Sequence, residues 1–557
     1  MKHRLAGLIF VAAVCHQLFY LHFLPLSLSI DSYGYMTYAA HLLSPDTPVV
    51  RTPGYPAIVA ALGVHWLDSL VPLVVFQMLV VATVPPLCFY ALLPAGYAAA
   101  WVGSVLSLLY AYPITMTQQV MTESTYMTGL LGALLLFAVY CIRRRLPWLL
   151  AAFAVAMITV EIRPSANILY VCITAGVVLL ALKERTRGLF IHTAIAVILS
   201  VTAVTGRSLV TDRNSANITP FFIYHWLSQC WLVGDSGVTF NPSAPNSSSC
   251  ISLETGPATR AFFDAVREML NVREDVYVSM ASGHDFRGAQ TGVRPEFQPR
   301  SPETIERLLQ DLATNTSENA HRAPAMVMAL WRQTGVGPGG ALLRAMVFET
   351  LLAHPQVLLQ KAPPLIKSLT FASELLRFNL VENHNALNEN VYWQFVPKSL
   401  TEYPVLDAYP GGPSAFAQWI FGLDQLTGRD PEAKLLSGRY PGEWRTTVDM
   451  FRQYDNYTIM AVHIGNWLTR MQTETLFWLS LVAIIPAFLT PLWPVAVAAF
   501  LAAWGLTVSS FVVQDNYRQI VLHVMPLILV TGLGLQGTVN WRRRRRETER
   551  GALTPAP

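Results

Sequence analysis

Long apolar runs separated by short polar segments fill the first 206 residues and the last part of the chain. A helix needs about 20 apolar residues to cross the hydrocarbon core of a membrane, and most of these runs approach that length. We therefore expect an all-α polytopic membrane protein. The pattern predicts ten membrane-spanning helices, at about residues 5–29, 70–92, 97–113, 122–142, 147–162, 166–183, 188–206, 475–491, 493–512 and 518–539.

A long block, residues 207–474, separates the seventh predicted span from the eighth. Its first part is rich in Asn, Ser, Pro and Gly, as loops are. Residues 340–378 are apolar with helical spacing, but their prolines and the basic residues Lys361, Lys367 and Arg377 favour interfacial helices over a span. The remainder indicates a folded globular segment. We expect a large extracytoplasmic domain of mixed secondary structure. Two additional membrane spans within this block would not change the side of the membrane on which the other loops lie.

Composition and charge support a membrane protein and give it an orientation. Hydrophobic residues make up 53% of the chain and charged residues only 13%, whereas charged residues are about a quarter of an ordinary soluble protein. The net charge of +4 is small, and the basic residues gather at the ends of predicted spans, which argues against a nucleic-acid partner. Ten spans with the N-terminus inside put all three basic clusters on the cytoplasmic side, as the positive-inside rule requires: 143–145, 183–187 and 542–546.

These signals divide the chain into four parts: a transmembrane module (1–206), the extracytoplasmic block (207–474), C-terminal transmembrane helices (475–541) and a basic cytoplasmic tail (542–557). Four of the six cysteines lie in apolar runs, as core thiols do. Cys230 and Cys250 lie in the polar block, where a disulfide stays open if that block is extracytoplasmic. No cysteine spacing typical of a zinc site occurs.

The first loop holds the first candidate chemistry. Asp31 stands where the first apolar run stops, and residues 32–43 continue with helical spacing and aromatic residues on one side, which predicts a helix along the membrane interface. Arg51 follows beside a predicted rigid turn, residues 52–56. An acid and a base are thereby held on one face of the membrane. The alternative is an Asp that caps a helix and an Arg that meets lipid headgroups.

Further ionisable residues are predicted to share that face. Charged groups at membrane depth are costly unless they are paired or functional, so their collection at one face is a site hypothesis. Each of them, taken singly, is also explained as an end-of-helix residue at the headgroup level. The set comprises Glu123 at the start of the fourth span, Glu161 and Arg163 between the fifth and sixth, and Asp515, Tyr517 and Arg518 at the start of the last.

The order of these motifs resembles the GT-C glycosyltransferases. Asp31, the Tyr-rich segment after it and Arg51 ahead of Pro-Gly-Tyr are similar to the first external loop of the branch that contains protein O-mannosyltransferases and lipid A aminoarabinose transferases. Thr122-Glu123, Arg163-Pro164 and the aromatic-Arg pair before the last helix are similar to later motifs of the fold. The resemblance covers roughly the first 200 residues and the last 80. The block 207–474 matches no motif.

This resemblance implies a GT-C-like fold and the transfer, with inversion, of a sugar from a polyprenyl phosphate to an acceptor on the external membrane face. The acceptor is an envelope glycolipid, a polysaccharide or a protein. Asp31 is the candidate base that takes the proton of the acceptor hydroxyl. Glu123, the second candidate catalytic residue, would bind the acceptor, position the partner of Asp31 or hold a divalent ion with it.

The same resemblance suggests residues that bind the donor. Negative charge left on the polyprenyl phosphate needs cations or aligned donors, and the candidates are Arg51, Arg163 and Arg518. Aromatic rings stack on sugars, although interfacial aromatic belts also explain tyrosines here; the candidates are Tyr33, Tyr35 and Tyr55.

No cofactor is certain from this chemistry. Two acids with no nearby histidine disfavour zinc. A requirement for another divalent metal ion stays open. The short loops and the lack of an organelle retention signal suggest a bacterial inner membrane, with the site facing the periplasm or exterior.

Two other functions stay open. An oligosaccharide ligase or polymerase that uses a lipid-diphosphate donor would need a long external loop, which is present, although the first loop resembles enzymes with a monophosphate donor. A transporter or flippase would be favoured by inverted repeats and broken helices in matching halves. The predicted plan of seven spans, a large block and three spans does not favour it.

Overall fold

The computed structural model describes residues 2–23, 35, 39, 42, 52–63, 71–117, 122–214, 256–274, 277, 281, 295–314, 336–353, 355, 456–514 and 524–553. Helix accounts for 88% of this part, and it contains no strand. The all-α prediction is therefore confirmed for the described residues. Several residues singled out from the sequence lie outside them: Asp31, Tyr33, Arg51, Cys230, Cys250, Asp515, Tyr517 and Arg518.

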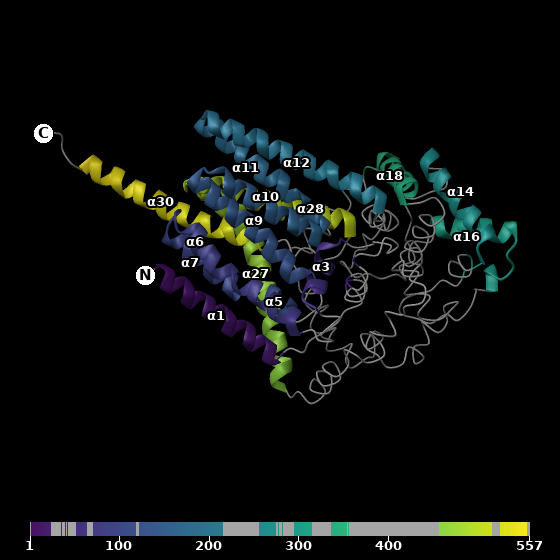
Figure 1. Ribbon diagram of the computed structural model, residues 1–557, viewed down its shortest axis with the longest axis horizontal. Coiled ribbons are helices and arrows are strands. Elements are labelled where there is room, and N and C mark those ends of the chain that lie inside the picture. The colour runs from purple at the N-terminus through teal and green to yellow at the C-terminus, as the bar shows by residue number, and fades with distance from the viewer. Residues whose placement is uncertain are drawn as a thin grey trace.

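Helices that pack side by side form the main bundle (Figure 1). Among the residues that the structure describes, four helical segments are long and apolar enough to cross a membrane, which is consistent with a membrane protein: 71–92, 123–143, 164–184 and 187–206. The described residues of the ten predicted spans are largely helical, but the number of membrane crossings stays a prediction. The helices are α1 (Lys2–Phe23), α3 (Gly54–Ala61), α5 (Val71–Ala82), α6 (Val84–Leu92), α7 (Tyr97–Leu109), α8 (Ala111–Met116), α9 (Glu123–Arg143), α10 (Leu146–Ile162), η1 (Pro164–Asn167), α11 (Ile168–Glu184), α12 (Arg187–Asn214), α27 (Asn456–Ala487), α28 (Trp493–Gln514) and α30 (Leu527–Leu553).

A smaller helical unit comes from the block 207–474. It consists of α14 (Pro257–Val272), the 3₁₀ turn η2 (Pro295–Phe297), α16 (Pro302–Thr314) and α18 (Val336–Ala353). Helix α18 contacts both α14 and α12, so this unit is joined to the main bundle through α12. Its place outside the membrane stays a prediction.

The three basic clusters gather at one end of the bundle, here called the basic end. Arg144 at the end of α9 pairs with Glu184 at the end of α11, with 2.5 Å between Nη2 and Oε1. Lys183 lies over the ring of Trp493 at the start of α28. The turn before α28 is joined to α30 by a hydrogen bond from Asn540 to Leu489 O. The chain termini lie toward the same end (Figure 1), which is the arrangement that the predicted alternation of spans requires.

Two of the predicted spans are interrupted. The segment 70–92 is divided at Thr83 into α5 and α6, because two prolines follow at 85 and 86. The predicted span 97–113 is interrupted near its end: α7 ends at Leu109, Tyr110 is extended (ψ 100°), and α8 begins at Ala111. Pro113 explains this break, since a proline clashes with the carbonyl four residues earlier, which is that of Leu109.

The predicted basic tail is not separate from the last helix. Helix α30 continues without interruption through the basic cluster 542–546 to Leu553. Two hydrogen-bonded ion pairs at i, i+4 spacing accompany the extension: Arg543 with Glu547 at 3.0 Å and Arg545 with Glu549 at 2.8 Å. Such pairs stabilise an exposed helix by a few tenths of a kcal/mol each, roughly 0.2–0.5.

Helices α27 and α30 pack with their backbones in close approach. A Cβ atom added at Gly534 would collide with the backbone of Ala483, and one added at Gly537 would collide with the carbonyl of Pro486. Small residues permit this distance between helices. The two glycines therefore set how closely the last helix packs in the bundle.

We expect Gly537→Ala to lower the thermal unfolding temperature in detergent, because the added methyl overlaps the Pro486 carbonyl at a cost of about 1–3 kcal/mol. The matched control is Gly206→Ala on α12, where a Cβ would meet nothing within 4 Å. There, the higher helix propensity of alanine should leave stability unchanged or raise it by up to about 1 kcal/mol. Tryptophan fluorescence measures the unfolding temperature of both variants. Equal changes in that temperature would contradict close packing at Gly537.

Candidate active site

Glu123 and Arg163 form an ion pair at the end of the bundle opposite the basic end. Arg163 Nη1 donates to Glu123 Oε1 and to Thr122 Oγ1, both at 3.4 Å. The Glu123 side chain is only 2% exposed, whereas that of Arg163 is 19% exposed. The buried carboxylate is thus neutralised by a cation that retains access to solvent.

Local sequence explains how the two residues reach these positions. Glu123 is the first residue of α9, where the helix dipole favours an acid. Arg163 follows the last residue of α10 and precedes Pro164, which disfavours helical backbone in the residue before it. Arg163 is accordingly extended, with φ −150° and ψ 120°. Its guanidinium lies 5.5 Å from the ring centre of Tyr126, one turn along α9, and the Tyr126 hydroxyl lies 2.9 Å from Ser165 Oγ.

The segment that follows the first loop packs directly against this corner. Thr52 Oγ1 donates to the carbonyl of Ile162 at 3.0 Å. A Cβ atom at Gly54 would stand 2.6 Å from the Glu161 carbonyl oxygen, so glycine is needed at this close approach. The predicted rigid turn at 52–56 is instead the beginning of helix α3, with Pro53 as its N-cap. Pro56 is tolerated there because the first turn of a helix needs no backbone N–H donors.

Tyr35 and Tyr55, two of the predicted sugar-stacking residues, pack against each other. Their ring centres are 5.0 Å apart in an edge-to-face arrangement. Tyr35 is 8% exposed and Tyr55 is fully buried. In this structure both rings therefore stabilise the packing of the first-loop region, and stacking on a sugar stays a prediction for them.

A buried glutamine that the sequence analysis did not single out lies beneath the ion pair. Gln77 of α5 accepts hydrogen bonds at Oε1 from Tyr55 (3.0 Å) and Ser124 (3.1 Å). Its Nε2 donates to the carbonyl of Thr117 at 2.8 Å, and the Thr117 hydroxyl donates to Gln17 of α1 at 3.2 Å. Gln17 and Gln77 are polar residues in the middle of apolar runs. That isolation is the signal by which the sequence could have revealed them.

The structure thus brings together only part of the predicted site. Glu123, Arg163, Tyr35 and Tyr55 lie in one region, joined through α3, α5, α9 and α10. Asp31, Tyr33, Arg51 and Arg518 lie outside the described residues. Within the described part of the chain, no group of three or more His, Cys, Asp or Glu residues could hold a metal ion. Metal dependence stays open.

The fold and the corner at Glu123 define an all-helical protein with helices able to cross a membrane and a buried, charge-paired site at one end of the bundle. No protein-family model matches the chain, and no curated protein or solved structure matches it.

We expect Arg163→Gln to destabilise the protein by about 1–3 kcal/mol, because it removes the arginine that pairs with the buried Glu123 carboxylate. The double variant Glu123→Gln/Arg163→Gln should recover much of this loss, since it removes both charges. Arg187→Gln at the exposed start of α12 is the matched control for loss of an arginine. Unfolding of the wild type, Glu123→Gln, Arg163→Gln and the double variant in detergent gives the coupling energy between residues 123 and 163. A double variant whose loss equals the sum of the two single losses would contradict the pair.

Proposed function

We propose that this chain is an integral membrane glycosyltransferase with a GT-C-like fold. It moves a sugar, with inversion, from a polyprenyl-phosphate carrier to a hydroxyl of an envelope glycolipid, polysaccharide or protein. Its site faces the exterior or periplasm of a bacterial inner membrane. The basic end faces the cytoplasm, as the positive-inside rule favours.

The observation that carries the proposal is the Glu123–Arg163 pair packed against Thr52 and Gly54. Three segments of the motif order that resembles the GT-C enzymes, Pro53-Gly54-Tyr55, Thr122-Glu123 and Arg163-Pro164, meet at one end of the bundle although they are about 110 positions apart at most. Packing alone would not require an acid and an arginine inside a helical bundle. Buried charged groups are costly unless they are paired or functional. Glu123 and Arg163 are paired with each other.

Arg163 has the properties that binding of a lipid phosphate requires. Its two side-chain hydrogen bonds both leave from Nη1. Among the described residues, Nε and Nη2 make no hydrogen bond, so two N–H-bearing nitrogens are left to face an anion. Guanidinium groups bind phosphate oxygens with two parallel bonds. We assign Arg163 to the donor phosphate and Glu123 to holding Arg163 in place, with Arg51 and Arg518 as further cations.

The proposed reaction needs one base, which accepts a proton, and one leaving group, which is the polyprenyl phosphate. Asp31 accepts the proton of the acceptor hydroxyl. The hydroxyl oxygen forms a bond to the anomeric carbon while the bond from that carbon to the phosphate oxygen breaks. The bonding pair stays on the polyprenyl phosphate, whose added negative charge Arg51, Arg163 and Arg518 stabilise. Asp31 is the residue on which proton transfer depends.

The test is mass spectrometry of envelope lipids and glycoconjugates from source cells without the gene. We expect one glycan to lose a single sugar, wild type to restore it, and Asp31→Asn to fail although it is inserted at the wild-type level. Arg163→Lys keeps the charge but loses the two-bond geometry, so it should restore the sugar only partly. Arg187→Gln at the basic end should restore it fully.

Three results would contradict the proposal. Full restoration by Asp31→Asn would remove the base. A lipid-linked precursor that changes sides or accumulates, with no glycan losing a sugar, would favour the flippase. Loss of a whole oligosaccharide from one acceptor would favour the ligase with a lipid-diphosphate donor.

A further inference from the structure

Helix α18 is fixed against α14 by a carboxylate cap. Glu349 of α18 accepts the backbone N–H groups of Ala258 (3.2 Å) and Thr259 (2.8 Å), and also the Thr259 hydroxyl (2.8 Å). Burial opposes its charged form, but these hydrogen bonds and the charge of Arg260 outweigh it and lower the pKa of Glu349. A charged carboxylate at a helix N-terminus is a favourable partner for the first N–H groups. The cap therefore fixes which face of α18 points toward α14.

The opposite face of α18 is apolar and exposed. Met346 and Thr350 are fully buried, whereas Phe348 is 65% and Leu352 is 67% exposed. The exposed positions Ala341, Ala345, Phe348 and Leu352 follow the spacing i, i+4, i+7, i+11, which places them on one stripe of the helix. All four residues of this stripe, here called the α18 stripe, are apolar.

The neighbour of α18 in the bundle is the helix with the most exposed apolar surface among the candidate spans. Residues 187–206 of α12 are apolar enough to cross a membrane, yet only 11% of that window is buried in the protein. Val197, Ile198, Val201 and Val204 are among its exposed side chains. So much apolar surface on a helix of this length is explained by contact with lipid.

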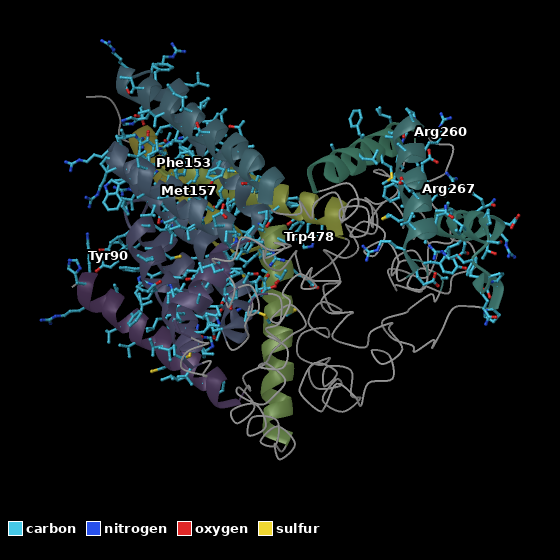
Figure 2. The ribbon with its side chains drawn as sticks, turned by 45° about the vertical axis from the view of Figure 1, so that its right-hand side comes forward. Tyr90, Phe153, Met157, Arg260, Arg267 and Trp478 are labelled. Atoms are coloured by element: carbon cyan, nitrogen blue, oxygen red, sulfur yellow. The ribbon has the colours of Figure 1, made fainter. Side chains whose placement is uncertain are left out.

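The α18 stripe lies close to the place where α12 would leave the membrane. Helix α12 starts at the basic end and continues for eight residues beyond the apolar window, to Asn214, which is about 12 Å at 1.5 Å per residue. Helix α18 contacts α12, and both views show it near the end of α12 that points away from the basic end (Figures 1 and 2). Figure 2 shows α14, with Arg260 and Arg267, farther from the bundle than α18.

We propose that α18 lies in the membrane interface, with the α18 stripe inserted between the headgroups and acyl chains of the leaflet on the side of the Glu123–Arg163 pair. Insertion continues the lipid-facing surface of α12 and removes Phe348 and Leu352 from water. Because Glu349 joins α18 to α14, the membrane contact also holds α14 and α16 close to the membrane on that side. This placement does not depend on the reaction that the chain catalyses.

The test is photocrosslinking of the full chain in nanodiscs made of phosphatidylcholine and phosphatidylglycerol. The photoreactive amino acid p-benzoylphenylalanine replaces Phe348 in one variant and Leu352 in a second. In the control it replaces Ala261, an exposed residue of α14. Only material that elutes as the wild type does on gel filtration is irradiated. Mass spectrometry then identifies the crosslinked partner.

We expect lipid adducts at positions 348 and 352, at least tenfold more abundant than at position 261. Crosslinks from both positions to peptides of the same chain, or to a second copy, would overturn the proposal and identify what covers the stripe instead. The proposal would also be overturned by adduct levels at 348 and 352 as low as at 261, because the stripe would then face water.

Discussion

Polar groups inside a bundle that crosses a membrane must find their partners within the protein, because lipid provides none. Gln77 meets this requirement for four elements at once. Its side-chain amide joins α5 to Tyr55 on α3, to Ser124 on α9 and to the Thr117 carbonyl at the end of α8. These are the segments on which the Glu123–Arg163 pair and the first-loop region depend. The geometry of the site is therefore tied to one buried amide that carries no charge and takes no part in the proposed chemistry.

The interruption between α7 and α8 follows the same rule. Extended backbone at Tyr110 releases the carbonyls of Leu108 and Leu109 from helical bonding. His16 Nδ1 lies 2.8 Å from the first, which requires the proton on Nδ1, and Gln472 Nε2 donates to the second at 2.9 Å. The break thus joins α1 and α27, from opposite ends of the sequence, beside the Gln77 network. Irregular backbone is tolerated at membrane depth when the protein buries it in this way.

The sequence predicted helices better than it predicted their limits and contacts. Apolar runs located the long helices of the bundle, because burial in lipid and burial in protein both select apolar residues, but they did not indicate the short helix α3. The sequence analysis did not predict the break at Tyr110, although Pro113 favours one, because a single proline changes the apolar character of the run very little. The continuation of α30 through the basic cluster was missed because composition suggests a tail, whereas the i, i+4 pairs Arg543–Glu547 and Arg545–Glu549 favour a helix.

For the site, the sequence indicated which residue types to examine and predicted a shared side, but it did not indicate which residues would pair. Glu123 and Arg163 were assigned separate roles because 40 positions separate them, and only the packing of α9 against α10 brings them together. The pairing limits what Glu123 can do, because its carboxylate already accepts a hydrogen bond from Arg163 Nη1. Under the proposed function, Asp31 therefore stays the candidate base, and Glu123 orients Arg163. The exposure of the two side chains agrees with this division of roles. Arg163 is 19% exposed and Glu123 is 2% exposed, so Arg163 is the more accessible of the two to an anionic ligand.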